Sequence, residues 1–393
     1  MDAVISDAAS PAVAAEAQRQ FRPAVYWYVT FRCNLACKHC WVNSSPSVDT
    51  SEDLTTDEML DVVAQMRELG AGRVLLSGGE ALYRPDMLTV IRELLGSRIN
   101  VSLETNGLLV TRKLTDLIKW GRDVHGAELT PAVSMDGGTS ETHDFLRGRG
   151  TFERVLQGMR TLRDEGITFD AQCVINKTNI ETIPALLERM SEMTPMLRRM
   201  QLAFLHAVGR GDKLVDKYGL EITDYNRAFD LVLEHGRKFP GQLTVKTPPA
   251  LIPPDKMVQM FAFTKKMGCS TSCAFPTLGV LNDGRITVCA LTRDDPGLCF
   301  GNVRTHRLLD IWKQKRMMAM REHYLAAQEL QGICGDCIFQ KECRGGCRAL
   351  AYDELGDWDA AHPLCANLAE VGQFPSAYRK SLRRDARQPE AVN

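Results

Sequence analysis

Short runs of apolar, β-branched and aromatic residues alternate along the first half of the chain with longer segments whose apolar residues recur at helical spacing. The runs that predict strands are Ala24–Thr30, Arg73–Ser77, Asn100–Glu104, Pro131–Met135, Asp170–Ile175 and Met200–Phe204. The segments that predict helices between them are Thr55–Leu69, Pro85–Leu95, Leu114–Trp120, Phe152–Glu165 and Ile180–Met193. Near-continuous apolar strands joined by helices indicate a parallel sheet of the α/β class. The periodicity fits a partial (β/α)6 barrel and an open doubly wound sheet equally well.

The rest of the chain is organised differently. One further helix is predicted at Tyr225–Phe239, followed by a Pro-rich segment at Pro248–Pro254 and a loop-rich, cysteine-rich region. From these shifts in composition we expect five segments: a flexible N-terminal segment (1–23), an α/β domain (24–240), a linker (241–268), a small cysteine domain (269–370) and a polar tail (371–393).

Composition and charge exclude several classes of protein. With 393 residues and a formal net charge of −1, the chain gives no electrostatic reason to bind nucleic acid or a membrane surface. No stretch approaches the roughly 18 uninterrupted apolar residues of a membrane span, and no export signal is evident. We therefore expect a cytoplasmic protein whose 13 cysteines stay reduced and serve mainly as metal ligands.

The most informative cysteines are Cys33, Cys37 and Cys40, which follow the first predicted strand in CxxxCxxC spacing. Three thiolates can hold three irons of a [4Fe–4S] cluster and leave the fourth iron open to a substrate or cofactor. A zinc site with a distant fourth ligand is the alternative reading of this motif.

Other polar motifs follow the next strands in turn. Gly78 follows the second predicted strand, Thr105 the third and Asp136 the fourth. Active sites in parallel α/β folds gather at the carboxyl ends of the strands, so we expect these motifs to meet there. In Ser77-Gly78-Gly79-Glu80 the glycines let the backbone approach a ligand, and the carboxylate that follows can bind an ammonium group.

Together these motifs resemble the radical S-adenosylmethionine (SAM) superfamily, in which the open iron binds the amino and carboxylate groups of SAM. The resemblance implies that Gly78, Gly79 and Glu80 form the segment that binds the methionine amino group, although Ala81 stands where proline is usual. It implies further cofactor-binding roles for Thr105 and Asn106, for Ser134 and Arg147 at the SAM carboxylate, and for Trp41 beside the adenine. A core position for Trp41 is an equally good interpretation.

The later cysteines resemble the SPASM domain, which holds up to two auxiliary [4Fe–4S] clusters. By that resemblance one cluster would use Cys269, Cys273, Cys289 and Cys347, and the other Cys334, Cys337, Cys343 and Cys365. A zinc ribbon, or clusters that only staple the domain together, are the alternatives. The combined resemblance implies a partial (β/α)6 barrel followed by a small loop-rich iron–sulfur domain.

What this implies for function is a radical SAM oxidoreductase that carries three [4Fe–4S] clusters and SAM. SAM would yield a 5′-deoxyadenosyl radical that removes hydrogen from a substrate, with net oxidative modification such as crosslinking of a ribosomally made peptide. The alternative substrate is a small metabolite, for example the propionate side chains of a tetrapyrrole. A non-enzymatic iron–sulfur electron carrier is a third possibility, which the SAM motifs disfavour.

The expected partners are a low-potential electron donor of the flavodoxin or ferredoxin type and a separate peptide-recognition protein. No catalytic acid or base is assigned from the sequence. His206, Asp136 and His143 are candidates, but we expect a structural role for each.

Overall fold

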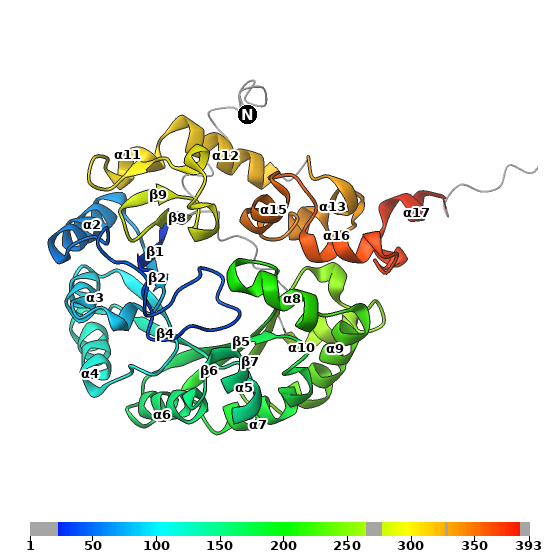
Figure 1. The fold of residues 1–393 in the computed structure, drawn as a ribbon, viewed down its shortest axis with the longest axis horizontal. Coiled ribbons are helices and arrows are strands. Elements are labelled where there is room, and N and C mark those ends of the chain that lie inside the picture. Colours follow the sequence, from blue (N-terminus) through cyan, green and yellow to red (C-terminus); the bar gives the residue numbers. More distant parts are fainter. Residues whose placement is uncertain (1–22, 265–276, 327–328, 386–393) are drawn as a thin grey trace, which may run out of the picture.

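Figure 1 shows the computed structural model, which describes residues 23–264, 277–326 and 329–385. In these residues one sheet of ten strands runs in the order β10-β9-β8-β1-β2-β3-β4-β5-β6-β7. Strands β1 to β7 are parallel, and helices surround the outer face of the curved sheet. The predicted α/β class and partial barrel are confirmed.

Each predicted strand of the first half is present, within a few residues of its expected bounds. The strands are β1 (Ala24–Thr30), β2 (Arg73–Gly78), β3 (Asn100–Thr105), β4 (Leu129–Ser134), β5 (Phe169–Ile175), β6 (Leu197–Phe204), β7 (Gln242–Lys246), β8 (Thr277–Val280), β9 (Arg285–Thr287) and β10 (Gly301–Asn302). The helices of the barrel are α2 (Thr56–Leu69), α3 (Met87–Gly96), α4 (Arg112–Trp120), α5 (Ser140–Arg147), α6 (Thr151–Asp164), α7 (Ile183–Ser191), α8 (Asp212–Tyr218), α9 (Ile222–Gly236) and α10 (Met257–Thr264). The C-terminal helices are α11 (Leu308–Trp312), α12 (Lys315–Ala326), α13 (Gly332–Asp336), α14 (Gln340–Cys343), α15 (Arg348–Leu355), α16 (Pro363–Glu370) and α17 (Lys380–Asp385).

Helix α2 shows how local sequence sets the bounds of these elements. The Thr55 hydroxyl accepts a hydrogen bond from the Glu58 amide, and the Glu58 carboxylate accepts one from the Thr55 amide. This reciprocal pair satisfies backbone donors that the first helical turn leaves free. The helix ends at Gly70, whose φ of 72° lies in the left-handed region.

The cysteine-rich region shares the sheet of the barrel. Strand β8 pairs with β1 in parallel, from Ala24 opposite Thr277 to Trp27 opposite Val280, and β9 then pairs with β8 in the antiparallel sense. Figure 1 shows the C-terminal helices running from this edge along one end of the barrel. The first barrel strand is therefore an interior strand, and the two regions are joined by backbone hydrogen bonds.

One expectation needs correction. The stretch 241–268 does not form a linker over its described part, because it carries β7, which pairs with β6, and α10. The Pro-rich character of Pro248–Pro254 suggested an open connection, but the described segment contains a buried 3₁₀ turn at Pro249–Leu251. The barrel sheet thus extends one strand beyond the predicted six.

No helix in the part of the chain that the structure describes is long and apolar enough to cross a membrane.

The buried strands lead to a prediction about stability. Leu76 on β2 is fully buried, so Leu76→Ala should lower the free energy of unfolding by about 2–5 kcal/mol, the usual cost of a core truncation. Leu355 on α15 is 51% exposed, and Leu355→Ala is the matched control with an expected change of about 0.5 kcal/mol or less. Urea unfolding of the anaerobic protein measures both; equal effects would contradict the assigned core.

Candidate active site at the barrel mouth

A cavity of about 390 Å³ lies at the carboxyl ends of the parallel strands. Its walls include residues from, or directly after, each of β1 to β6, together with residues of the C-terminal region. The residues predicted for the SAM-binding cluster and for SAM itself that line it are Cys33, Cys37, Cys40, Trp41, Gly78, Gly79, Glu80, Thr105, Asn106, Ser134 and Arg147. The structure therefore brings together eleven residues that are separated by up to 114 positions in the sequence.

Cys33, Cys37 and Cys40 lie on the loop that follows β1, which we call the cysteine loop. Their thiols face backbone and side-chain N–H groups. The Leu35 amide lies 3.4 Å from the sulfur of Cys33, and the Ser44 amide lies 3.3 Å from that of Cys40. Burial, together with the nearby Glu80, Cys37 and Cys40, raises the pKa of Cys33 to about 12. Buried thiols in one place favour a bound cation that stabilises their thiolate forms. With their donor N–H groups they fit the three-cysteine ligand set of an iron–sulfur cluster.

The segment after β6 holds this cysteine loop in place. The Arg210 guanidinium donates hydrogen bonds to the carbonyl oxygens of Cys37 (2.7 Å) and Ser44 (2.6 Å), and its amide donates to that of Cys40 (3.0 Å). Gly209 lies so close that a Cβ atom there would be 2.5 Å from the Cys40 carbonyl oxygen. The sequence analysis missed both residues, since neither belongs to a recognisable motif.

The glycines of the Gly78-Gly79 pair are needed for a different reason from the one predicted. A Cβ at Gly78 would lie 2.1 Å from the Thr30 carbonyl oxygen, and one at Gly79 would lie 2.1 Å from that of Arg32. The Gly79 amide donates to Thr30, and the next amide donates to Arg32. The pair therefore lets β2 approach the end of β1 and the start of the cysteine loop.

Glu80 is a buried carboxylate aimed into this site. The Thr105 hydroxyl (2.9 Å) and the Asn106 amide (2.8 Å) both donate to it. Burial raises the pKa of Glu80 to about 7, against the effect of these hydrogen bonds. No ion pair to Glu80 occurs among the described residues, so an ammonium group at the cavity would complete its environment. Thr105 and Asn106 thus position Glu80.

A buried ionic group borders the cavity on the other side. Asp136 is fully buried, and its carboxylate accepts from Arg147 (2.6 Å) and from His39 (2.9 Å). Burial opposes the charged form, yet Arg147 and His39 hold the pKa of Asp136 well below its usual range. Arg147 also directs Nη1 toward the sulfur of Cys37, at 4.0 Å. His39 was not singled out by sequence, because it lies between two cysteines of the motif and is not itself part of the motif.

The remaining candidates have distinct surroundings. His143 accepts a hydrogen bond from the Asp136 amide, which identifies it as a structural residue. His206 lines the cavity, and burial lowers its pKa to about 4. The Ser134 hydroxyl oxygen lies 3.4 Å from the side-chain nitrogen of Gln172. Trp41 packs edge-on against Tyr28 and also lines the cavity.

The structure also groups most of the C-terminal cysteines. Four of them line one small pocket: Cys334, Cys337, Cys343 and Cys365. The His362 amide lies 3.3 Å from the sulfur of Cys334, and the Phe339 amide lies 3.4 Å from that of Cys337. Burial raises the pKa of both thiols. The four could hold one cluster of the all-cysteine type.

The other predicted set is described only in part. Cys289 and Cys347 belong to the same hydrophobic group, and Cys347 also lines the cavity at the barrel mouth. Cys269 and Cys273 lie outside the described residues. Cys299 and Cys173 stand apart from both sets: Cys173 is a buried residue of β5.

Comparison with known proteins identifies the class. The family model described as the radical SAM superfamily matches residues 27–190, and the one described as the SPASM iron–sulfur cluster-binding domain matches residues 269–338. The AdoMet-dependent heme synthase of Methanosarcina barkeri is 30% identical over 359 residues, which cover 87% of this chain and 95% of that protein. The mycofactocin maturase MftC of Mycobacterium tuberculosis is 24% identical and covers 86% of this chain and 81% of that protein.

A solved structure shares the fold. Streptococcus suis SuiB bound to S-adenosylmethionine superimposes with a TM-score of 0.65 at 16% identity, and the match covers 88% of this chain and 78% of SuiB. This chain belongs to the radical SAM superfamily and carries a SPASM domain. It is an enzyme that uses SAM and iron–sulfur clusters.

The close contact at Gly209 leads to a prediction. Gly209→Ala should displace the cysteine loop, because Gly209 has a φ of +55° and its Cβ would meet two carbonyl oxygens within 2.6 Å. Gly126→Ala is the matched control, since Gly126 also has a positive φ (+65°) but nothing lies within 4 Å of its Cβ. Iron content after anaerobic reconstitution should fall by about a third in the first variant only. Equal iron contents would contradict the proposed clamp.

Proposed function

We propose that this enzyme oxidatively modifies a ribosomally made peptide by crosslinking it. The enzyme would hold three [4Fe–4S] clusters. The SAM-binding cluster would use Cys33, Cys37 and Cys40. The two auxiliary clusters would use Cys334, Cys337, Cys343 and Cys365, and Cys269, Cys273, Cys289 and Cys347. With SAM bound, the open cluster supplies a 5′-deoxyadenosyl radical that removes a hydrogen atom from an unactivated carbon.

The residues of the chain bind and orient the cofactor. Glu80, buried and without an ion-pair partner among the described residues, takes the methionine ammonium. Ser134 and the N–H groups of Arg147 that Asp136 does not use take the carboxylate. Trp41 covers the adenine side of the cavity, and the aromatic and aliphatic wall excludes water from the radical.

One observation carries the oxidative part of the proposal. Cys347 and Leu350 of the C-terminal region line the same cavity as the cysteine loop. A cluster held at Cys347 would therefore adjoin the substrate and could accept the electron that the substrate loses after hydrogen abstraction. A cluster that only stapled the domain together would not need to border this cavity.

The charges of the cavity wall support a peptide. Among its described residues, Arg147 is paired with Asp136, Arg210 with backbone carbonyls, and His39 with Asp136. No cation is left to bind the several carboxylates of a tetrapyrrole. The side-chain amides of Gln172 and Gln201 line the cavity instead, and amides match the donors and acceptors of a peptide backbone.

A tetrapyrrole is the second candidate, and sequence similarity favours it. The heme synthase of M. barkeri is more similar to this chain than the mycofactocin maturase is, at 30% against 24% identity. A cluster at Cys347 would also adjoin a propionate side chain in this cavity and could accept the electron that it loses, although the cavity wall offers that side chain no free cation. The choice between the two substrates therefore needs an experiment.

The partners follow from the chemistry. Reductive cleavage of SAM needs a low-potential electron, which we assign to a flavodoxin or ferredoxin. A separate protein would present the peptide. A reducing cytoplasm is the compartment in which the thiols can assemble their clusters.

The proposed role of Glu80 can be tested by binding. Glu80→Gln keeps the shape of the side chain but removes its charge, so the affinity for SAM should fall by about tenfold or more while the iron content is unchanged. Glu104→Gln is the control, because Glu104 also lines the cavity but accepts hydrogen bonds from Tyr26 and Ser77. Isothermal titration of the anaerobic protein with SAM measures both. Unchanged affinity in Glu80→Gln would rule out the ammonium contact.

The substrate is tested by mass spectrometry after anaerobic co-expression with each short peptide encoded beside the gene. We expect the mass of the peptide to fall by about 2 Da for each pair of hydrogens that it loses. The Cys33→Ala variant should leave the peptide unmodified. The second arm incubates the reconstituted enzyme with SAM and an iron tetrapyrrole that carries propionates. Loss of carboxyl groups from that compound, with an unmodified peptide, would overturn the peptide proposal in favour of the second candidate.

A further inference from the structure

Lys38 differs from its neighbours in the cysteine loop. The residues on either side of it, Cys37 and His39, line the cavity at the barrel mouth, whereas Lys38 does not line it and is exposed. Its side chain therefore leaves the loop on the side away from the cavity. Because Lys38 is bonded directly to Cys37, a partner that contacts Lys38 is separated from the Cys37 thiol by a single residue of backbone.

Two aromatic rings extend the surface around Lys38. The Nζ atom of Lys38 lies 3.6 Å from the centroid of the Phe145 ring on α5, and Phe145 packs edge-on against Tyr218 of α8 with ring centroids 5.2 Å apart. The Nζ atom of Lys217 lies 5.2 Å from the centroid of the Tyr218 ring. Both rings are half-buried, and neither lines the cavity. We call these four residues, together with Lys213 of α8, the lysine–aromatic surface.

This surface is fixed relative to the cysteine loop. The Lys38 amide donates a hydrogen bond to the carbonyl oxygen of Leu146 near the end of α5, at 2.8 Å. Leu146 and Leu214 of α8 belong to one buried apolar group, against which Phe145 and Tyr218 pack. A protein that docks on the two rings therefore meets the cysteine loop in a defined position.

The charges of α8 are sorted onto different faces. Lys213 and Lys217 are four residues apart and share one face of the helix, and both are exposed. Asp212 and Asp216 share another face. Asp212 contributes to the raised pKa of Glu354 in α15, which places this acidic face toward the C-terminal region.

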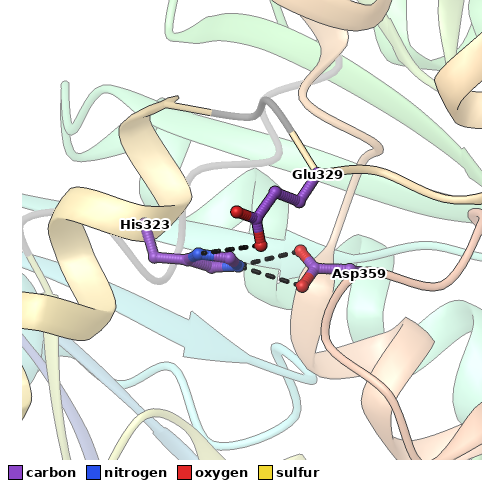
Figure 2. Close-up of side chains that lie close together, drawn as sticks. All are labelled: His323, Glu329 and Asp359. Atoms are coloured by element: carbon purple, nitrogen blue, oxygen red, sulfur yellow. Dashed lines mark hydrogen bonds and ion pairs between the residues drawn. The ribbon is translucent and has the colours of Figure 1, made fainter. Parts of the chain in front are cut away.

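Basic side chains elsewhere on the molecule face carboxylates of the chain itself. Figure 2 shows His323 between Asp359, which is 2.9 Å from Nε2, and Glu329, which is 4.0 Å from Nδ1. In the same way the Arg307 guanidinium lies 2.7 Å from the Glu68 carboxylate. None of the three lysines of the lysine–aromatic surface forms an ion pair with another described residue.

One carboxylate shares part of this surface. Glu141 is exposed and lies one turn before Phe145 on α5, so both side chains project from the same face of that helix. Three lysines against one carboxylate leave the surface positive, which suits an acidic partner.

We propose that the lysine–aromatic surface is the docking site of an acidic electron-carrier protein of the flavodoxin type, which delivers the electron for SAM cleavage past Lys38 to the cluster at Cys33, Cys37 and Cys40. The unpaired lysines complement an acidic carrier and set its orientation. The aromatic rings suit the flat, apolar edge of a flavin, which favours a flavodoxin over a ferredoxin. The proposal rests on the proposed function in one respect, namely that a protein supplies this electron.

The transfer is balanced with one electron. The anionic flavin hydroquinone of the carrier becomes the neutral semiquinone, and the oxidised cluster is reduced by the electron that the flavin loses. No proton changes place.

Docking is tested by isothermal titration of the anaerobic, reconstituted full-length protein with oxidised flavodoxin. We expect saturable binding that weakens as salt is added, and about fivefold weaker binding to Lys38→Glu and to Lys217→Glu. Lys238→Glu is the matched control, because Lys238 is exposed and precedes β7, at the end of the barrel opposite to the cysteine loop. Absence of saturation, or equal affinities of Lys217→Glu and Lys238→Glu, would overturn the proposal.

A gain of affinity tests the same surface from the opposite direction. Glu141→Lys removes the carboxylate beside Phe145 and should strengthen flavodoxin binding by about fivefold. Weaker binding of flavodoxin to this variant would contradict the proposed contact.

Electron delivery is tested by the formation of 5′-deoxyadenosine from SAM. The rate with flavodoxin, kept reduced by its reductase, is divided by the rate with dithionite, which needs no docking surface. This ratio should be about tenfold lower in Lys217→Glu than in Lys238→Glu. Lys217 is the decisive position because Lys38 adjoins Cys37, so that a loss of iron in Lys38→Glu would not affect the conclusion.

Equal ratios in Lys217→Glu and Lys238→Glu would overturn the delivery of electrons at this surface. A wild-type protein that binds flavodoxin as expected but fails to cleave SAM with dithionite would instead count against the proposed function alone.

Discussion

The close approach of backbone segments around the cysteine loop is the constraint on which the site depends. Gly78 and Gly79 bring β2 against the end of β1, and Gly209 brings the segment after β6 against the same loop from the other side. At each contact a single added carbon would lie within 2.5 Å of a carbonyl oxygen. A loop with little regular structure is thereby held rigidly, which a reactive cluster requires of its ligands.

Electrostatics adds a second constraint, because the cavity buries charges of both signs. Asp136 is held between His39 and Arg147, and such a buried group is retained only when its partners stay in place. Glu80 lacks a cation among the described residues, and its raised pKa reflects the cost of that burial. Among the described carboxylates of the cavity wall, Asp136 is thus ion-paired, whereas Glu80 and Glu104 are held by hydrogen bonds.

The shared sheet explains how the C-terminal region contributes to the same site. Because β8 pairs with β1, the segments that follow β8 are held beside the strand that leads into the cysteine loop. Cys347 and Leu350 can therefore face the barrel mouth, although they lie more than 300 residues from Cys33 in the sequence. A tethered but independent domain would not keep Cys347 at a constant distance from the cysteine loop.

The amino-acid sequence by itself determined the class of the protein, because the spacing of Cys33, Cys37 and Cys40 and the order of strands and helices are local properties of the chain. It also indicated Glu80, because the Gly78-Gly79-Glu80 segment follows the next predicted strand after the CxxxCxxC motif. Only the tertiary structure showed that Arg210 clamps the cysteine loop and that His39 pairs with Asp136. These roles depend on distances between segments far apart in the chain, and no short-range pattern encodes such distances. The pairing of β8 with β1 and the position of Cys347 at the barrel mouth are of the same kind, because they arise only when the C-terminal region packs against the barrel.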